Sequence, residues 1–427
     1  MNCATAGSGE TRGSGPIGGS QTFRRQKRKT IVKALAELHR LPPPWRQVWN
    51  DRSGARIGVT ALQRRRTELI DATQFDRHCP DVYGSAHPKA LLASIPEIGE
   101  PLQPLATQHV IASGQFEAGT LLQLFRLAAK FESNPERYIR INKPLTGKIL
   151  INAFFEPSTR TRLSFASAWH RLGGETITIG DRSTTGIAKG ESYADIGEMF
   201  NHYGDCVVLR DSVEDSVYQM TRSLRIPIIN AGNGTDEHPT QAMADLYTMF
   251  KWRPELCQAA VPASAQVRIG IVGLPNRMRT VRSLLRTLAH FPTMAREVVI
   301  FHDPGLSPEQ IFDPGQREEL EEAGLVLSTS TDLRSELGEL DVIYINAIAW
   351  VGDGYETHGR SFRLSADLPL KPGAMVLHPL ARGVELCTSL DRTPHNWYFS
   401  QARGAVFVRM ALLTCMVERT ERVLDVI

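Results

Sequence analysis

The sequence has few cysteines and no long apolar run, and both absences narrow what the chain can be. Its 427 residues include six cysteines, which are scattered and form neither a CxxC pair nor a Cys/His cluster. This pattern argues against a zinc site and a disulfide framework, and it favours reduced thiols in a cytoplasmic protein. No apolar run approaches the roughly 20 residues that span a bilayer. The N-terminus also lacks the apolar core of a secretory signal, so no membrane association is expected.

A large net charge is absent as well. The formal net charge is +3, and residues 1–104 carry 16 Lys and Arg against 9 Asp and Glu, so the basic excess is confined to the N-terminal quarter. Hydrophobic residues make up 42% and charged residues 22% of the chain, which is typical of a soluble globular protein. The length is sufficient for two or three domains with their own cores.

Residues 1–104 are predicted to form a basic, partly disordered N-terminal extension. Residues 1–23 are rich in Gly and Ser and have little to bury. The basic run 24–29 then leads into a short amphipathic helix, with Ile31, Leu35 and Leu38 on one face, that ends at the three prolines 42–44. Such a run can serve nucleic-acid contact, targeting or docking, but most often it is a solvated face. We expect a docking or regulatory role and no nucleic-acid partner.

From residue 105 onwards, strand-like runs alternate with helical lengths. Strands are predicted at 149–155, 176–179, 206–210, 226–230, 267–272, 298–302, 325–328, 342–346 and 375–377. Helices are predicted at 116–131, 158–172, 191–203, 239–252, 280–290, 314–323 and 405–426, the last apolar on one side. This alternation indicates the α/β class, with two doubly wound parallel-sheet domains joined by helices. The expected domain bounds are 105–245 and 246–404.

The stretch 148–172 (KILINAFFEPSTRTRLSFASAWHRL) combines a buried strand, a turn at Pro157 and a helix. The first helical turn carries Ser158, Thr159, Arg160 and Thr161. Free backbone N–H groups and the positive end of the helix dipole make such a turn an anion site. The planar guanidinium of Arg160 matches phosphate oxygens. Spacing alone leaves a second interpretation open, in which the hydroxyl residues only cap the helix and the arginines are solvated.

Further polar residues follow other predicted strands. Arg210 ends the strand 206–210, the run His238-Pro-Thr-Gln241 follows the strand 226–230, and His378-Pro379-Leu380 follows the strand 375–377. Ligands of open α/β sheets bind beyond the carboxyl ends of the strands. Each of these residues alone is a weak signal, but together they predict a site at that edge.

The segment FFEPSTRTRLSF resembles the phosphate-binding signature of the aspartate/ornithine carbamoyltransferase family. The motifs STRTR, KGE, Arg, HPTQ and HPL follow in the family's order, and the resemblance covers residues 108–427. It implies transfer of the carbamoyl group of carbamoyl phosphate to an amine, without metal or cofactor. The family's HPL form favours L-aspartate as acceptor, which gives N-carbamoyl-L-aspartate in pyrimidine biosynthesis. It also implies that the helix 405–427 returns to complete the carbamoyl-phosphate-binding domain, and that residues 246–404 bind the amino acid.

The resemblance assigns roles to individual residues. It implies that the phosphate is held by Ser158, Thr159, Arg160 and Arg210, and the carbonyl oxygen by Thr161, Arg210 and His238. The implied catalytic residues are Arg160, Thr161, Arg210 and His238. Preset donors of this kind stabilise the charge that develops on the oxygen. The carbamoyl NH2 group would be accepted by the side chain of Gln241 and the backbone at Pro379 and Leu380. No dedicated base is needed if the departing phosphate takes the proton.

A shared site is also implied. In the family, the loop that contains Thr185 and Lys189 reaches into a neighbouring subunit, so a homotrimer is expected. Lys189 keeps the family's lysine, whereas Thr185 replaces the usual serine. On composition alone, Lys189 would be an exposed lysine on a mobile loop. A regulatory or dihydroorotase-like partner could bind through the N-terminal extension.

The acceptor site departs from the family pattern. Arg279 matches the carboxylate-binding arginine, but Leu274 and Arg277 stand at the acidic and tyrosine positions, and Ala347 and Ala349 replace an Arg-x-Gln. A lost charge-assisted contact is worth roughly 1.5–3 kcal/mol. Candidates for its replacement are Arg277, Arg360, Arg363 and Arg382. Two alternatives therefore stay open, a carbamoyltransferase for another amine and a non-catalytic paralogue that binds carbamoyl phosphate. A dinucleotide-binding dehydrogenase is disfavoured, because VRIGIVGLPNR lacks GxGxxG.

Overall fold

The computed structural model describes residues 88–418, except 136, 138–141 and 347–358. The predictions for residues 1–87, the two alanines 347 and 349, and the end of the C-terminal helix lie outside the described residues. No helix in the described part combines the length and the apolar character needed to cross a bilayer.

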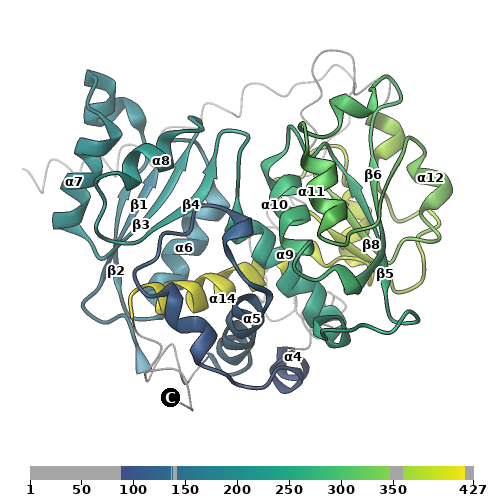
Figure 1. Ribbon diagram of the computed structural model, residues 1–427, viewed down its shortest axis with the longest axis horizontal. Coiled ribbons are helices and arrows are strands. Elements are labelled where there is room, and N and C mark those ends of the chain that lie inside the picture. Colours follow the sequence, from purple (N-terminus) through teal and green to yellow (C-terminus); the bar gives the residue numbers. More distant parts are fainter. Residues whose placement is uncertain (1–87, 136, 138–141, 347–358, 419–427) are drawn as a thin grey trace, which may run out of the picture. The chain divides into compact units, whose positions relative to one another are not determined.

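The first sheet consists of four parallel strands in the order β2-β1-β3-β4 (Figure 1). These are β1 (Ile149–Phe154), β2 (Glu175–Ile179), β3 (Cys206–Asp211) and β4 (Ile228–Asn233). The associated helices are α6 (Thr159–Arg171), α7 (Tyr193–Tyr203) and α8 (Ser216–Thr221), of which α8 was not predicted. Strands β1, β3 and β4 are almost entirely buried, which explains their nearly continuous apolar runs. The edge strand β2 is largely exposed.

The second sheet has five parallel strands in the order β7-β6-β5-β8-β9. These are β5 (Val267–Val272), β6 (Ala295–Phe301), β7 (Leu327–Ser330), β8 (Val342–Ile345) and β9 (Met375–Leu377). Its helices are α10 (Arg279–Leu288), α11 (Gln316–Glu322) and α12 (Leu333–Glu336). Short 3₁₀ helices occupy Glu100–Leu105, Ser113–Gln115, Arg182–Thr184, Gly186–Lys189, Pro254–Cys257, Pro292–Met294, Pro308–Gln310, Gly359–Phe362 and Thr388–Arg392. The prediction of two parallel α/β sheets is confirmed.

Helices α4 (Pro88–Ser94), α5 (Ala118–Ser133), α9 (Pro239–Trp252) and α14 (Tyr398–Met416) form a packed layer. In Figure 1, α14 lies in yellow beside α5 and α9. Helix α14 begins at Tyr398, earlier than the predicted start at 405. It is buried on nearly all sides, so the prediction that it is apolar on one side is wrong. The reason is that α5, α6 and α9 all pack against it.

A buried ion pair joins these helices. The Lys251 ammonium lies 2.9 Å from the Glu132 carboxylate, and the two side chains are 0% and 5% exposed. The Tyr247 hydroxyl donates a hydrogen bond of 2.7 Å to the same carboxylate, and Arg403 contributes a more distant charge. Burial lowers the pKa of Lys251, and the charge of Glu132 opposes that shift.

We expect Glu132→Ala to lower the free energy of unfolding by about 3–5 kcal/mol, because it leaves the Lys251 ammonium buried without its carboxylate. The matched control is Glu198→Ala, which breaks the exposed pair with Arg225 and is expected to cost less than about 1 kcal/mol. Urea unfolding of both variants measures the difference. Equal losses for the two variants would contradict this account.

Candidate functional site

Three helix N-termini converge on one cavity. The cavity has a volume of about 1020 Å³, and it is lined by the first turns of α6, α9 and α10 together with segments that follow β3, β6, β8 and β9. In parallel sheets these segments lie at the carboxyl ends of the strands, where ligands bind. The helix N-termini contribute positive dipole ends and free N–H groups. The cavity is therefore suited to an anion.

Eleven of the thirteen predicted site residues line this cavity. They are Ser158, Thr159, Arg160, Thr161, Arg210, His238, Gln241, Arg277, Arg279, Pro379 and Leu380. The two exceptions are Thr185 and Lys189, which are not among the described residues that line the cavity of their own chain. Lys189 is exposed at the end of a 3₁₀ helix.

A carboxylate that was given no role from the sequence lies between two of the arginines. Arg210 donates to Glu156 Oε1 over 2.6 Å, and Arg279 donates to Glu156 Oε1 and Oε2 over 2.8 and 3.2 Å. Arg210 also donates to the carbonyl oxygen of Ala231. Arg210 ends a strand of the first sheet, whereas Arg279 begins α10 beside the second sheet. Glu156 therefore joins the two halves of the site through one carboxyl group.

The electrostatics of this cluster follow from burial and from the mixture of charges. Burial would raise the pKa of Glu156, but hydrogen bonds and charges from Arg279 and Arg210 lower it below its ordinary value. Burial and the nearby charge of Arg279 lower the pKa of Arg210 to about 10. Burial also lowers the pKa of Arg160. Arg210 nevertheless stays cationic at neutral pH, because a pKa of about 10 lies well above 7.

His238 is held neutral at the start of α9. Burial, followed by the charges of Arg210, Arg409 and Arg279, lowers its pKa well below the ordinary value. Its backbone N–H donates to Ser283 Oγ over 2.9 Å. Its Nδ1 atom is buried and has no hydrogen-bond partner among the described residues. A neutral imidazole in this position can offer a hydrogen bond without adding a charge.

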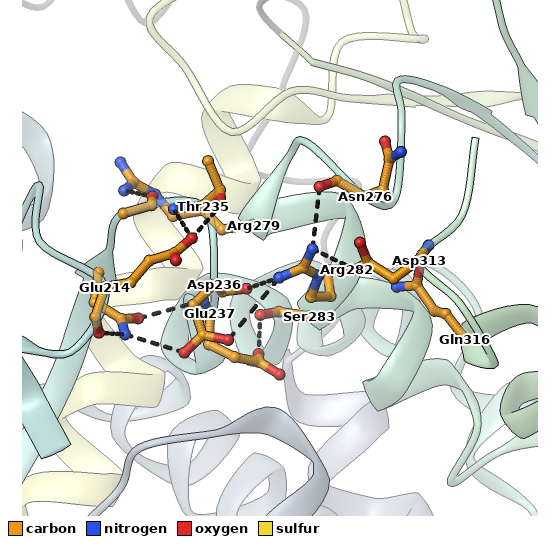
Figure 2. Close-up of polar contacts among 12 residues, drawn as sticks. Glu214, Thr235, Asp236, Glu237, Asn276, Arg279, Arg282, Ser283, Asp313 and Gln316 are labelled. Carbon is orange, nitrogen blue, oxygen red and sulfur yellow. Dashed lines mark hydrogen bonds and ion pairs between the residues drawn. The ribbon is translucent and has the colours of Figure 1, made fainter. Parts of the chain in front are cut away.

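One face of α10 holds the loop that carries His238 (Figure 2). Arg279, Arg282, Ser283 and Arg286 are spaced i, i+3, i+4 and i+7 and so lie on one side of the helix. Arg279 donates to the Gly234 carbonyl oxygen, Ser283 donates to Glu237, and Arg286 donates to Glu237 Oε1 over 2.6 Å. Arg282 donates to the Asp236 carbonyl oxygen over 3.4 Å and to Asp313 Oδ2 over 2.5 Å. The position of α10 therefore fixes the backbone at His238.

The loop that contains Thr185 and Lys189 is anchored beside the same cluster. Asp211 follows Arg210 directly and is fully buried. Its carboxylate accepts hydrogen bonds from the Tyr193 hydroxyl over 2.6 Å and from Arg182 over 3.1 Å. The loop thus starts from a fixed point, while Lys189 stays exposed.

Among the candidates whose side chains are described, Arg277 is the best placed to supply the expected acceptor cation. It lines the cavity, it is exposed, and its guanidinium forms no hydrogen bond or ion pair with the described residues. Arg382 is paired with Asp391 through a hydrogen bond of 2.8 Å. Among the described cavity-lining residues, neither Arg382 nor Arg363 is present. The side chain of Arg360 lies outside the described residues. His302 and Asp303, which sequence reasoning did not single out, line the cavity as well.

We expect His238→Gln to make the fold less sensitive to acid. The pKa of His238 is lowered by folding, so below about pH 6.5 the unfolded chain binds one more proton than the native state. The wild type then loses up to about 1.4 kcal/mol of unfolding free energy for each pH unit of acidification. Chemical denaturation between about pH 7 and pH 5 should show a shallower loss for His238→Gln. The control His202→Gln changes an exposed histidine of α7, and a slope for His238→Gln equal to that of the control would refute the assignment.

Two family models match most of the part of the chain that contains the cavity. Residues 108–251 match the family model "Aspartate/ornithine carbamoyltransferase, carbamoyl-P binding domain", and residues 265–416 match "Aspartate/ornithine carbamoyltransferase, Asp/Orn binding domain". The aspartate carbamoyltransferase catalytic subunit of Alkaliphilus oremlandii is 34% identical over 325 residues, which cover 74% of this chain and 93% of the relative. That of Methanopyrus kandleri is 36% identical over 320 residues, which cover 73% and 98%.

Solved structures give the same result. The crystal structure of aspartate transcarbamoylase from Trypanosoma cruzi in complex with carbamoyl phosphate and aspartate is 29% identical, with a TM-score of 0.64. The match covers 76% of this chain and 99% of that one. The same enzyme in complex with N-(phosphonacetyl)-L-aspartic acid is 26% identical, with the same TM-score and the same coverage. The two regions that match the family models, 108–251 and 265–416, contain the described residues that line the cavity. The chain belongs to the aspartate/ornithine carbamoyltransferase family.

Proposed function

We propose that this chain transfers the carbamoyl group of carbamoyl phosphate to the amine of L-aspartate. The products are N-carbamoyl-L-aspartate and phosphate, and the reaction is a step of pyrimidine biosynthesis. The observation that carries the proposal is the convergence of Arg160, Arg210 and a neutral His238 on one cavity at the N-termini of α6 and α9. The Trypanosoma cruzi relative, solved with carbamoyl phosphate and aspartate together, supports both substrates.

The first turn of α6 binds the phosphate. Ser158, Thr159 and Arg160 line the cavity at the start of α6, and Arg160 forms no hydrogen bond or ion pair with the described residues. A dianionic phosphate at a helix N-terminus gains from both the dipole and the charge-assisted hydrogen bonds. Binding in this position leaves the carbonyl carbon directed towards Thr161, Arg210 and His238.

The carbonyl oxygen gains negative charge when the amine attacks. Thr161, Arg210 and His238 are preset donors for it, and their fixed positions lower the barrier without reorganisation. Neutral His238 contributes a hydrogen bond and no competing positive charge. The C–O bond to phosphate then breaks, and the departing phosphate takes the proton of the amine, so the chain needs no dedicated base.

The acceptor carboxylates are assigned to Arg279 and Arg277. Arg279 is held by Glu156 and by the Gly234 carbonyl oxygen at the junction of the two halves. Arg277 lies at the β5–α10 turn, and we propose that it supplies the cation that Ala347 and Ala349 do not. An acceptor with a single carboxylate would need only one of these arginines. The second candidate function, carbamoyl transfer to another amine, rests on this altered acceptor side.

We propose a homotrimer with shared sites. In the described part of the chain, Leu163 on α6 and Ile177 on β2 are large apolar residues that are 58% and 45% exposed, and α6 packs on β2. Subunit contact there would cover both and bring Lys189 and Thr185 to a neighbouring cavity. Mixing Arg160→Ala and Lys189→Ala subunits would then restore some activity, whereas no recovery would count against sharing.

The assignments outside the catalytic core are also proposals. We assign residues 105–245, completed by the C-terminal helix 405–427, to carbamoyl-phosphate binding and residues 246–404 to amino-acid binding. Of the expected extension 1–104, residues 88–104 pack against α5, α9 and α14, so the docking of a regulatory or dihydroorotase-like partner in the cytoplasm is proposed for residues 1–87. Removal of residues 1–87 should alter assembly or nucleotide response, and unchanged behaviour in both would remove the docking role.

We expect Arg160→Ala to lower kcat/KM for carbamoyl phosphate by about 10²–10³-fold, because it removes a fixed cation from the phosphate. The matched control is Arg171→Ala at the other end of α6, where the arginine contacts only Ser167. Steady-state assays with a panel of amino acids make the measurement. Turnover confined to an amine other than aspartate would transfer the assignment to the second candidate, and a wild type without turnover would refute an enzymatic role.

We expect Arg277→Ala to raise KM for aspartate by about 10–100-fold while KM for carbamoyl phosphate stays unchanged, because one charge-assisted contact to a carboxylate is lost. Arg296→Ala removes an exposed arginine of β6 and serves as the control. A variant with unchanged KM for aspartate would exclude Arg277 from the acceptor site.

A further inference from the structure

Four hydrogen bonds link Gln241 to the turn at Leu380. Gln241 Nε2 donates to Asp245 Oδ1 over 2.7 Å, and Gln401 Nε2 donates to the same oxygen over 2.5 Å. The His378 backbone N–H donates to Gln401 Oε1 over 3.0 Å, and the Leu380 N–H donates to His378 Nδ1 over 2.8 Å. The interior members Asp245, Gln401 and His378 are at most 1% exposed. The relay passes from α9 through α14 to the end of β9.

The carboxylate of Asp245 sets the orientation of both amides. An ionised carboxylate only accepts hydrogen bonds, so each glutamine must present its NH2 group to Oδ1. Because Gln241 lines the cavity and its NH2 group is committed to Asp245, its Oε1 is the atom left for a ligand. The same constraint turns Gln401 Oε1 away from Asp245 and towards the His378 N–H. Asp245 Oδ1 therefore fixes the orientation of both the Gln241 and the Gln401 amide.

The turn after β9 is fixed from the other side as well. Since Leu380 N–H donates to His378 Nδ1, the ring proton sits on Nε2, which donates to Glu385 Oε1 over 3.0 Å. Glu385 also accepts the Gly383 N–H over 2.6 Å. Leu380 has a φ of 54°, a left-handed conformation that costs a non-glycine residue about 1 kcal/mol or more. These hydrogen bonds hold Leu380 in that conformation at the cavity wall.

The relay depends on an acceptor oxygen more than on a charge. Burial raises the pKa of Asp245 to about 7, so part of the population carries a proton near neutral pH. With that proton on Oδ2, Oδ1 still accepts from both glutamines. An asparagine at this position can offer the same oxygen, whereas a leucine of similar size cannot.

We propose that Asp245, acting with Gln401, is a positioning residue that makes the site selective for the NH2 group of carbamoyl phosphate. This rests on the proposed function, because it concerns the same carbamoyl site. Gln241, Pro379 and Leu380 line the same cavity, and we assign Gln241 Oε1 and the main-chain carbonyls at Pro379 and Leu380 as the acceptors. An NH2 group can donate to them, whereas the methyl group of acetyl phosphate, which has the same shape, cannot. On this proposal, the buried carboxyl group of Asp245 contacts neither acyl phosphate. It sets the selectivity between them by fixing the orientation of Gln241.

The test compares dissociation constants for carbamoyl phosphate and acetyl phosphate on the full-length protein by calorimetry. We expect Asp245→Leu to weaken carbamoyl phosphate by about 10–100-fold, since acceptors are lost or misplaced, and to leave acetyl phosphate within about threefold. Asp245→Asn should keep the wild-type ratio. Gln401→Leu removes the link between Asp245 and His378 on α14. It should reduce the preference for carbamoyl phosphate over acetyl phosphate, and it provides the test if Asp245→Leu does not fold.

The control is Thr248→Val, which removes a buried hydroxyl of α9 that donates only to Ala244. It should lower stability without changing the ratio of the two affinities. The proposal is overturned if Asp245→Leu and Gln401→Leu keep the wild-type ratio, or if Asp245→Asn behaves like Asp245→Leu. A wild type that fails to bind carbamoyl phosphate would instead refute the proposed function, so the two failures are distinguishable.

Discussion

The site depends on one carboxylate, that of Glu156, placed between guanidinium groups from the two halves of the protein. Arg210 and Arg279 would repel each other without it, and the pKa of Arg210 already reflects the nearby charge of Arg279. With Glu156 in place, two cations share one anion and keep a net positive charge for a ligand. A phosphate that binds Arg210 competes with Glu156 for the same guanidinium. Ligand binding and the link between the halves are therefore coupled through a single residue.

Much of the fold could be predicted because the strands are short apolar runs bounded by turns. The bounds of α9, β5 and β9 agree with the prediction, and those of the other predicted elements, apart from α14, differ by a few residues. Helix α14 was misjudged because its first turns contain Ser400 and Gln401, which read as loop residues. The polarity of Gln401 is explained by partners distant in sequence, since Gln401 bonds to Asp245 and His378. Periodicity cannot reveal such contacts.

The candidate site, like the fold, could be predicted where its residues are adjacent in sequence and not where their role depends on distant partners. The anion-binding turn at Ser158 to Thr161 could be predicted, because its residues are adjacent and the chemistry of a helix N-terminus is local. Glu156 lies in the same segment, but its role depends on Arg279, which is far away in sequence. Asp245 could have been found, since it stands four residues after Gln241 on a predicted helix. The proposed role of Arg277 as the acceptor cation could not be predicted from the sequence. The choice between Arg277 and Arg382 depends on Asp391, which pairs with Arg382 and not with Arg277.

The position of α14 has a consequence for how the chain is made. This last helix packs against α5, α6 and α9, all of which are synthesised long before it. Until α14 leaves the ribosome, the apolar faces that it covers remain open to solvent, so the first half of the protein cannot complete its core before α14 is synthesised. The contacts of α14 with α5, α6 and α9 join residues that are far apart in sequence. Forming them slows folding, because the entropy cost of closing the long loops must be overcome first. The half that contains the first sheet is thus synthesised before the other half but is completed only when α14 has been added.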